Sequence, residues 1–205
     1  MVEANSAPAA GARIETALQL LTPASVVVAA PAGRMLDAAA ARPIVELPQG
    51  KGVAALILSE PELARSLDAD GVHLSWRKDV LSAYAAAREI LGPACIVGAD
   101  AGRSRHDAMT LGEQGADYVA FGIPAHVGER DAARARRRDL VAWWAEIFEV
   151  PVVAFDLESP EEAAELAAAG ADFVAVTLAD AMPAGELESW VEAVEAATPG
   201  LATVA

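Results

Sequence analysis

The feature that most constrains this chain is a short phrase that occurs three times: a helix end, a glycine or alanine, an aspartate and a brief apolar run. The middle copy, residues 114–124, reads Gln-Gly-Ala-Asp-Tyr-Val-Ala-Phe-Gly-Ile-Pro, and the other copies are residues 68–74 and 169–176. Gly115 suits the left-handed conformation that often ends a helix. Tyr118 and Val119 favour a strand, in a run apolar enough to be buried on both faces. Three copies predict a repeated helix–strand unit.

Apolar runs and helical patterns alternate along the rest of the chain. Strands are predicted at residues 25–30, 53–58, 71–74, 94–98, 118–121, 151–155 and 173–176. Helices are predicted at residues 12–21, 80–91, 104–114, 139–148, 160–169 and 186–197, with a short one after Ser59. Residues 35–41 look helical, but Pro43 is expected to interrupt them. A polar loop is predicted at residues 126–138. Residues 1–11 are expected to be disordered, and residues 12–205 to form a single domain.

This alternation predicts a parallel sheet covered by helices, an α/β fold. Two architectures fit it: an eight-stranded β/α barrel and an open doubly wound sheet. No Gly-x-Gly-x-x-Gly turn follows the first strand, so nothing favours a dinucleotide-binding sheet. Seven predicted strands are one short of a closed barrel. Because the chain begins with a helical pattern, the missing or irregular strand of a barrel would be the first.

Composition narrows the classes of partner. The chain has 205 residues, 54% of them hydrophobic, and carries 15 basic against 30 acidic residues, a net charge of −15. Such acidity argues against binding nucleic acid or an anionic membrane, because both need basic surface. No apolar run reaches about 18 residues and no signal peptide is recognised, so no membrane span is predicted. The single Cys95 cannot form an internal disulfide, which fits a cytoplasmic protein.

Four stretches carry a family resemblance, at residues 69–74, 96–98, 115–124 and 150–155. In order and spacing they resemble the thiamine phosphate synthase family, including its thiazole tautomerase relatives. The resemblance implies a β/α (TIM-type) barrel with a phosphate-binding site at the carboxyl ends of the strands. It therefore favours the barrel over the open sheet, and a small phosphorylated ligand as the partner.

The family reaction joins a hydroxymethylpyrimidine pyrophosphate to a thiazole phosphate, with Mg²⁺ holding the leaving pyrophosphate. The resemblance places the metal ligands at Glu60, which follows Ser59 where the family has Asn-Asp, and at Asp79. Asp79 matches only after a slip of one residue, because in strict register Lys78 occupies that position. Mg²⁺ is the cofactor that the resemblance implies.

Other positions depart from the family pattern. Asp100 stands where the family has a pyrophosphate-binding serine, and Asp156 and Leu157 replace two glycines. A negative charge a few ångströms from a phosphate costs on the order of several kcal/mol in a partly desolvated site. We therefore expect a divergent thiamine phosphate synthase-like barrel in which ordinary synthase activity is weak or lost. The alternative is a catalytically inactive barrel that acts as a partner or regulatory subunit.

Several residues are candidates for ligand contacts. Those expected to bind substrate are Arg103, Arg105, His106, Gly122, Asp156 and Thr177. The two arginines and the free amides at a helix start could bind phosphate, although a solvated first turn explains them as well. His126 is the catalytic candidate, because the tautomerase branch carries a histidine after its Phe-Gly and imidazole can move a proton near neutral pH. A histidine on a surface loop is the alternative.

Three other groups have structural interpretations. His73 lies inside a predicted strand, where a hydrogen-bonded core histidine is expected. The basic run at residues 134–138 could clamp a phosphate or pair with acidic residues, and the second is favoured. Trp143 and Trp144 cannot both face one core, so one of them marks a candidate homodimer contact.

Overall fold

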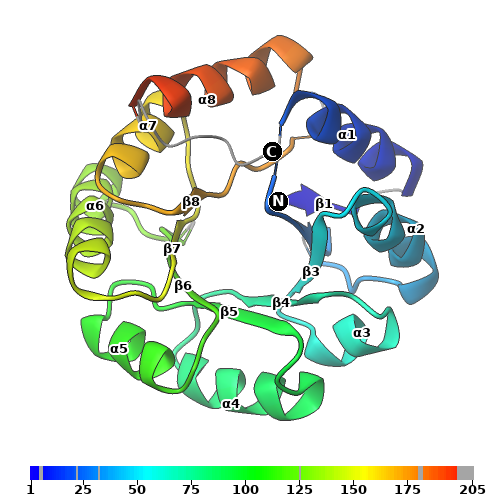
Figure 1. Cartoon of the computed structure of the whole chain (residues 1–205), viewed down its shortest axis with the longest axis horizontal. Helices are drawn as coiled ribbons and strands as arrows, with labels where there is room; N and C mark the ends of the chain where they lie inside the picture. Colours follow the sequence, from blue (N-terminus) through cyan, green and yellow to red (C-terminus); the bar gives the residue numbers. More distant parts are fainter. Residues whose placement is uncertain (5–6, 22, 32, 125, 180–181, 198–205) are drawn as a thin grey trace.

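The structure, a computed structural model, describes residues 1–4, 7–21, 23–31, 33–124, 126–179 and 182–197. Figure 1 shows a ring of strands inside a ring of helices. The strands are β1 (Val2–Glu3), β2 (Ser25–Ala29), β3 (Ala54–Leu58), β4 (Gly71–Leu74), β5 (Ile96–Asp100), β6 (Tyr118–Phe121), β7 (Val152–Ala154) and β8 (Phe173–Val174). The helices are α1 (Ala7–Leu20), α2 (Ala38–Gln49), α3 (Pro61–Ser66), α4 (Val80–Leu91), α5 (Arg105–Glu113), α6 (Arg130–Ile147), α7 (Pro160–Ala168) and α8 (Ala184–Ala197).

The sheet follows the order of the chain from β1 to β8, and every neighbouring pair is parallel. A parallel bridge between Val2 and Leu178 brings the segment after β8 beside β1. The amide of Leu178 also donates to the carbonyl of Met1 at 2.8 Å. The predicted β/α barrel is therefore confirmed, and the strand that the sequence pattern lacked is the two-residue β1.

The expectation of a disordered segment at residues 1–11 differs from the structure. Residues 2 and 3 form β1, and α1 already begins at Ala7, although residues 5 and 6 lie outside the described part. Val2 is fully buried, and Ile14 and Ala17 of α1 join it in the same apolar cluster. Composition missed this because a two-residue strand, held by its neighbours in the sheet, leaves no periodic pattern to recognise.

The repeated Gly/Ala-Asp phrase has one structural purpose in all three copies. The carboxylate of each aspartate accepts a hydrogen bond from the backbone amide near the start of the preceding strand. Asp70 accepts from Ala55 at 2.7 Å, Asp117 from Val97 at 2.8 Å and Asp172 from Val152 at 2.8 Å. The repeat therefore joins the beginnings of neighbouring strands, at the end of the barrel opposite the carboxyl ends where such barrels place their sites.

Two helices differ from the sequence prediction. Helix α2 continues through Pro43 and Pro48, with Ile44 and Val45 buried beneath it. Burial of this face offsets the hydrogen bond that each proline removes. Helix α6 begins at Arg130, inside the range predicted to be a polar loop, because its arginines find acidic partners on the next unit of the barrel.

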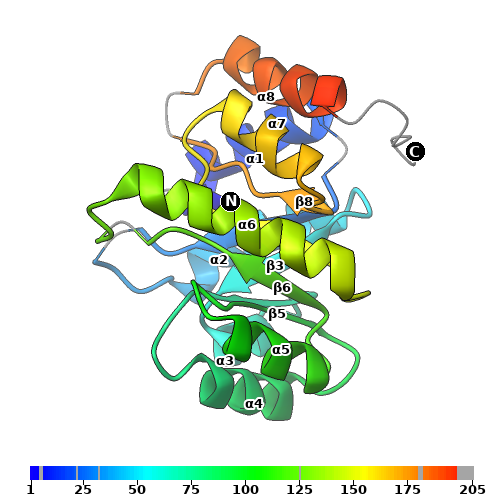
Figure 2. The same ribbon diagram turned by 90° about the vertical axis from the view of Figure 1, so that its left-hand side faces the viewer.

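Helices of the outer ring cover the sheet, and Figure 2 shows α1, α7 and α8 at one side of the barrel and α3, α4 and α5 at the other. Trp144 of α6 is fully buried and stacks on Phe148, with ring centroids 4.1 Å apart. Trp143 is partly buried, and the guanidinium of Arg105 lies 4.5 Å from its ring centroid. The homodimer contact stays a prediction. In the described part of the chain, no helix is long and apolar enough to cross a membrane.

Candidate functional site at the barrel mouth

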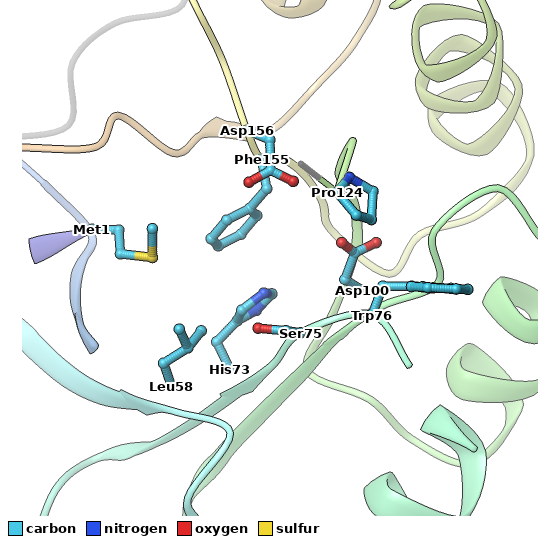
Figure 3. A pocket seen from close by; sticks show the side chains of 9 residues that line it. All are labelled: Met1, Leu58, His73, Ser75, Trp76, Asp100, Pro124, Phe155 and Asp156. Carbon is cyan, nitrogen blue, oxygen red and sulfur yellow. The ribbon is translucent and has the colours of Figure 1, made fainter. Parts of the chain in front are cut away.

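A cavity of about 240 Å³ opens at the carboxyl ends of the strands. Figure 3 shows the side chains that project into it from β3, β4, β5 and the turns that follow β4, β6 and β7. Its lining residues are Met1, Leu58, His73, Ser75, Trp76, Asp100, Pro124, Phe155 and Asp156. The position is the one at which β/α barrels place their chemistry.

Two carboxyl groups converge over Gly122, which follows β6. A methyl group built on Gly122 would lie 2.6 Å from Oδ2 of Asp100 and 2.5 Å from Oδ2 of Asp156. The two oxygens therefore flank one small space, within the roughly 4–6 Å over which charged groups shift each other's pKa. Glycine is required here by the carboxyl groups, because any larger residue would displace both of them.

Backbone amides fix the position of the Asp100 carboxyl group. It is 4% exposed, and its Oδ1 accepts hydrogen bonds from the amides of Gly102 at 2.7 Å and Gly122 at 3.2 Å. Burial raises the pKa of Asp100 to about 7, and the neighbouring charge of Asp156 acts in the same direction. At neutral pH this carboxyl group is therefore divided between its protonated and ionised forms.

Asp156 differs from Asp100 in its surroundings. The residue is exposed at the mouth, and its Oδ2 accepts from the amide of Ile123 at 2.9 Å. Partial desolvation of the carboxyl group raises the pKa of Asp156, while the positive charges of Arg137 and Arg130 oppose the rise. Its backbone φ is 57°, a left-handed conformation that aspartate tolerates better than most residues. The two carboxyl groups thus flank the same space, but different surroundings set their pKa values: Asp100 is almost fully buried, whereas Asp156 is exposed and is influenced by two arginines.

The stacked rings of His73 and Phe155 form the floor of this cavity, and the ring of Tyr118 packs beside His73 without lining the cavity. His73 lies between Phe155, with ring centroids 4.0 Å apart, and Tyr118, with centroids 5.8 Å apart, and all three rings are nearly parallel. Nδ1 of His73 and the hydroxyl of Tyr118 form a hydrogen bond of 2.9 Å. Burial lowers the pKa of His73 to about 3, so this imidazole is neutral at physiological pH. The expected hydrogen-bonded core histidine is confirmed, and it also forms part of the cavity wall.

A second cavity, of about 290 Å³, lies next to the first and shares Trp76 and Pro124 with it. Its other lining residues are Arg77, Lys78, Gly102, Arg103, Ser104, Asp107, His126 and Val127. Ser104 caps helix α5 by accepting the amide of Asp107 at 3.1 Å. Arg77 is engaged by Asp79 through two hydrogen bonds, of 2.6 and 2.8 Å. Lys78 and Arg103 are exposed and give this cavity a cationic wall, in contrast to the acidic first cavity.

Arginines of α6 hold the turn that carries Asp156. Arg137 is 2% exposed and donates to the carbonyls of Phe155 and Asp156 and to the carboxylate of Glu162. Arg130 and Arg134 both pair with Glu158, which lies in the same turn. The basic run at residues 134–138 therefore pairs with acidic residues, as the sequence analysis favoured.

The structure brings together only some of the predicted site residues. Asp156 lines the first cavity, Arg103 and His126 line the second, and Gly122 lies beneath the carboxyl pair. The remaining predicted residues line neither cavity: Glu60, Asp79, Arg105, His106 and Thr177. Trp76 and Phe155 were not predicted as wall residues, although Trp76 lies two positions after the predicted strand at residues 71–74 and Phe155 is the last residue of the one at 151–155.

Comparison with known protein families decides the affiliation of the chain. The family described as thiamine monophosphate synthase has a sequence model that matches residues 14–179. The chain belongs to this family. The match spans the strands from β2 to β8, and so includes the carboxyl pair and every residue that lines the two cavities except Met1.

Individual members of the thiamine monophosphate synthase family agree with this. The chain is 41% identical to a thiamine-phosphate synthase of Rhodospirillum centenum over 66% of its own length and 62% of that protein. It is also 41% identical to one of Hyphomonas neptunium, over 65% of its length and 59% of that protein. The chain thus covers less than two thirds of the length of these relatives. The solved thiamine phosphate pyrophosphorylase of Pyrococcus furiosus shares the fold with a TM-score of 0.70 and 21% identity, over 91% of this chain and 90% of that one.

The magnesium ion that family resemblance implies does not fit the residues predicted to bind it. Both carboxylate oxygens of Asp79 bond to Arg77, and Glu60 lies at the start of α3 with its side chain outside both cavities. Among the described residues, no three His, Cys, Asp or Glu side chains lie close enough together to hold a metal ion. Mg²⁺ is usually bound by one or two carboxylates together with waters and substrate phosphates, but neither predicted carboxylate lines a cavity in which such a phosphate could bind.

Proposed function

We propose that this member of the thiamine monophosphate synthase family binds a phosphorylated thiazole or pyrimidine, with the ring in the first cavity and the phosphate in the second. The observation that carries the proposal is that the two cavities adjoin at Trp76 and Pro124 but differ in charge. One has an aromatic floor, and the other has a cationic wall. A ligand with a flat ring and a phosphate on a short tether matches this pair of environments.

The second cavity offers a phosphate both positive charge and the start of a helix. Lys78 and Arg103 supply the charge, and Ser104 and Asp107, at the cap and in the first turn of α5, also line this cavity. Charged hydrogen bonds to phosphate are stronger than neutral ones, and a helix start adds a favourable dipole. This placement also keeps the phosphate away from the carboxyl pair, so its repulsion from Asp100 and Asp156 is reduced.

Ordinary synthase activity is a separate question. From its residue type alone, Asp100 is expected to carry a fixed negative charge facing a pyrophosphate, but burial raises its pKa to about 7, so it can be neutral when an anion approaches. The electrostatic cost is then smaller than a full charge implies. We therefore propose an altered site with reduced synthase activity. We also retain the cytoplasm as its proposed location, consistent with the free Cys95.

Calorimetry with a matched ligand pair tests the proposal. The phosphate ester of 4-methyl-5-(2-hydroxyethyl)thiazole should bind at least tenfold more tightly than the free alcohol. Lys78→Ala and Arg103→Ala should remove most of that difference, whereas Arg105→Ala, whose guanidinium lies over Trp143, should not. No binding of the phosphate ester at millimolar concentration, or equal loss in all three variants, contradicts the proposal.

His126 is proposed as the residue that moves a proton, in keeping with its expected catalytic role. It is exposed at the wall of the second cavity, and its ring centroid lies 5.8 Å from that of Trp76. His126→Gln keeps a polar side chain of similar size but cannot accept and return a proton. If the chain isomerises a phosphorylated thiazole, this variant should lower kcat at least tenfold and leave ligand affinity within about twofold.

The second candidate function is a catalytically inactive barrel that acts as a partner or regulatory subunit. It is favoured by the predicted metal ligands, which lie outside both cavities. Incubation with hydroxymethylpyrimidine pyrophosphate, thiazole phosphate and Mg²⁺ separates the two. Turnover by the natural chain that is lost in Asp156→Ala excludes the inactive barrel. Absence of turnover, although the natural chain binds the thiazole phosphate, supports it.

A further inference from the structure

The first cavity combines an unusual set of groups for a protein that handles phosphates. Lysine and arginine are absent from the described residues that line it, while two aspartates and the rings of His73, Trp76 and Phe155 are present. His73 cannot contribute a positive charge, because burial keeps it neutral. Every charged side chain in the lining is therefore acidic.

The inner carboxyl group has an oxygen available for a ligand. Oδ1 of Asp100 accepts both backbone amides, and among the described residues its Oδ2 has no hydrogen-bond partner. The side chain is more than nine-tenths buried, and Oδ2 lies beside the cavity next to Oδ2 of Asp156. Because this oxygen faces the open cavity and is not enclosed by protein, it can accept from a donor or pair with a cation supplied from outside the chain.

The aromatic rings define the shape of that cation. Phe155 stacks on His73 to give a flat floor, and Trp76 forms the wall toward the second cavity, packed against Gly102. Aromatic faces attract cations, most strongly where water is excluded. Carboxylates beside aromatic rings thus favour a flat organic cation, because such a ligand can contact the rings with its face while its charge lies near the carboxylates.

We propose that the carboxyl pair of Asp100 and Asp156, with the rings of Phe155 and Trp76, forms a binding site for a flat organic cation. This proposal adds to the function proposed above that the ring bound in the first cavity is positively charged. It rests on that function only for the position of the ring in this cavity. The site takes a nitrogen heterocycle or an aryl amine that carries its positive charge near the ring.

Binding at this site is linked to one proton. Asp100 faces the negative charge of Asp156 and the positive charge of Arg137, and Asp156 in turn faces Arg137 and Arg130. A cation placed between the two carboxyl groups favours the ionised form of Asp100 and lowers its pKa. Near pH 7 the cation therefore displaces a proton from Asp100, and affinity rises with pH. A ligand that lowers this pKa by one unit binds about tenfold more tightly above pH 7 than below it.

The test uses probes without phosphate, so that its failure is distinguishable from failure of the phosphate cavity. N-Methylpyridinium is a flat cation whose charge does not change with pH, and benzyl alcohol is a neutral control of similar size. Titrations of the whole chain followed by NMR at pH 6 and pH 8.5 should show binding of the cation that strengthens at least fivefold at the higher pH. Benzyl alcohol should bind more weakly and with no such change.

Three variants separate a cation site from general packing. Asp100→Asn keeps the acceptor for both amides but cannot ionise, so the pH dependence should disappear and affinity at pH 8.5 should fall at least fivefold. Asp156→Asn should weaken the cation at both pH values, and asparagine tolerates the positive φ at this position. Asp139→Asn, on the exposed face of α6, is the control and should change nothing.

Calorimetry gives an independent measurement of the proton. In buffers of different ionisation enthalpy, the cation should release a substantial fraction of one proton at pH 7 from the natural chain and none from Asp100→Asn. Equal binding of benzyl alcohol and N-methylpyridinium overturns the proposal. So does an affinity for the cation that is the same at pH 6 and pH 8.5, or unaltered in Asp156→Asn.

Discussion

Nη1 of Arg137 donates a hydrogen bond of 3.2 Å to the main-chain carbonyl of Asp156, so helix α6 fixes a residue at the mouth of the barrel. The same guanidinium bonds to the carboxylate of Glu162 at the start of α7. Asp156 has a φ of 57°, and conformations of this kind persist only where the surroundings impose them. Arg137 is therefore the residue that positions one half of the carboxyl pair.

Replacing Arg137 by methionine should destabilise the chain strongly. The variant keeps an apolar stem of similar length but leaves the buried Glu162 with the amide of Glu158 and a single charged partner, Arg134, whose Nε lies 3.3 Å away. Breaking one side of a buried ion pair typically costs about 3–5 kcal/mol. Urea denaturation should show a loss of about 3 kcal/mol. Arg136→Met, one position earlier on the exposed side of α6, is the control and should stay within about 0.5 kcal/mol.

Asp100→Asn should change how stability depends on pH. The folded chain holds the proton of Asp100 up to about pH 7, whereas an unfolded aspartate loses it near pH 4. Between these values the folded state binds more protons, so this residue makes the natural chain less stable as pH rises, and the effect levels off above pH 7. Asparagine does not titrate. The stability of the variant relative to the natural chain should therefore increase between pH 4 and pH 7, by at most about 4 kcal/mol.

Thermal and urea unfolding of both proteins at several pH values measure this difference. The sign is the informative part, because a surface aspartate with a normal pKa produces no change over the same range. A difference in stability that is constant from pH 4 to pH 8 would mean that Asp100 is ionised throughout, and it would also remove the proton linkage inferred for the cavity.

Tyr118→Phe should cost stability without altering the shape of the barrel. The hydroxyl bonds to Nδ1 of His73, and the ring packs against Gly98, where an added methyl group would lie 2.0 Å from the ring. Phenylalanine keeps the ring but leaves a buried imidazole nitrogen without its partner, which costs about 1–3 kcal/mol. Urea unfolding measures the loss. An increase in stability would show that His73 bonds elsewhere.

Much of the fold could be predicted because the responsible signals are local. The strand at Tyr118–Phe121 and the helix at Val80–Leu91 have the predicted bounds, and Ser104 caps α5 as expected. The first strand could not be found, because Val2 is held by sheet neighbours far along the chain and two residues show no period. The first part of helix α6, before the predicted helix at residues 139–148, was missed for a similar reason, since its arginines are stabilised by Glu158 and Glu162.

The site was predicted less completely than the fold. Asp100 and Asp156 could be placed at strand ends from the sequence, but their convergence over Gly122 depends on the register of three strands. The protonation of Asp100 depends on burial, which residue type alone does not reveal. Family resemblance also pointed to Glu60 and, after a slip of one residue, to Asp79. The carboxylate of Asp79 is paired with Arg77, and Glu60 lies outside both cavities.

Each aspartate of the repeated Gly/Ala-Asp phrase should contribute to stability by joining two neighbouring strands. Oδ2 of Asp172 accepts the amide of Val152 at 2.8 Å, as Asp117 and Asp70 do for the strands before them. A hydrogen bond to a charged group contributes about 1.5–3 kcal/mol, and Asp172 is exposed, so the lower value applies. Asp172→Ala should lose about 1.5 kcal/mol, and Asp172→Asn, which retains an acceptor, should lose less than half of that. Urea unfolding compares both with Asp139→Ala; equal stability of Asp172→Ala and that control would mean that the repeated aspartate does not hold neighbouring strands together.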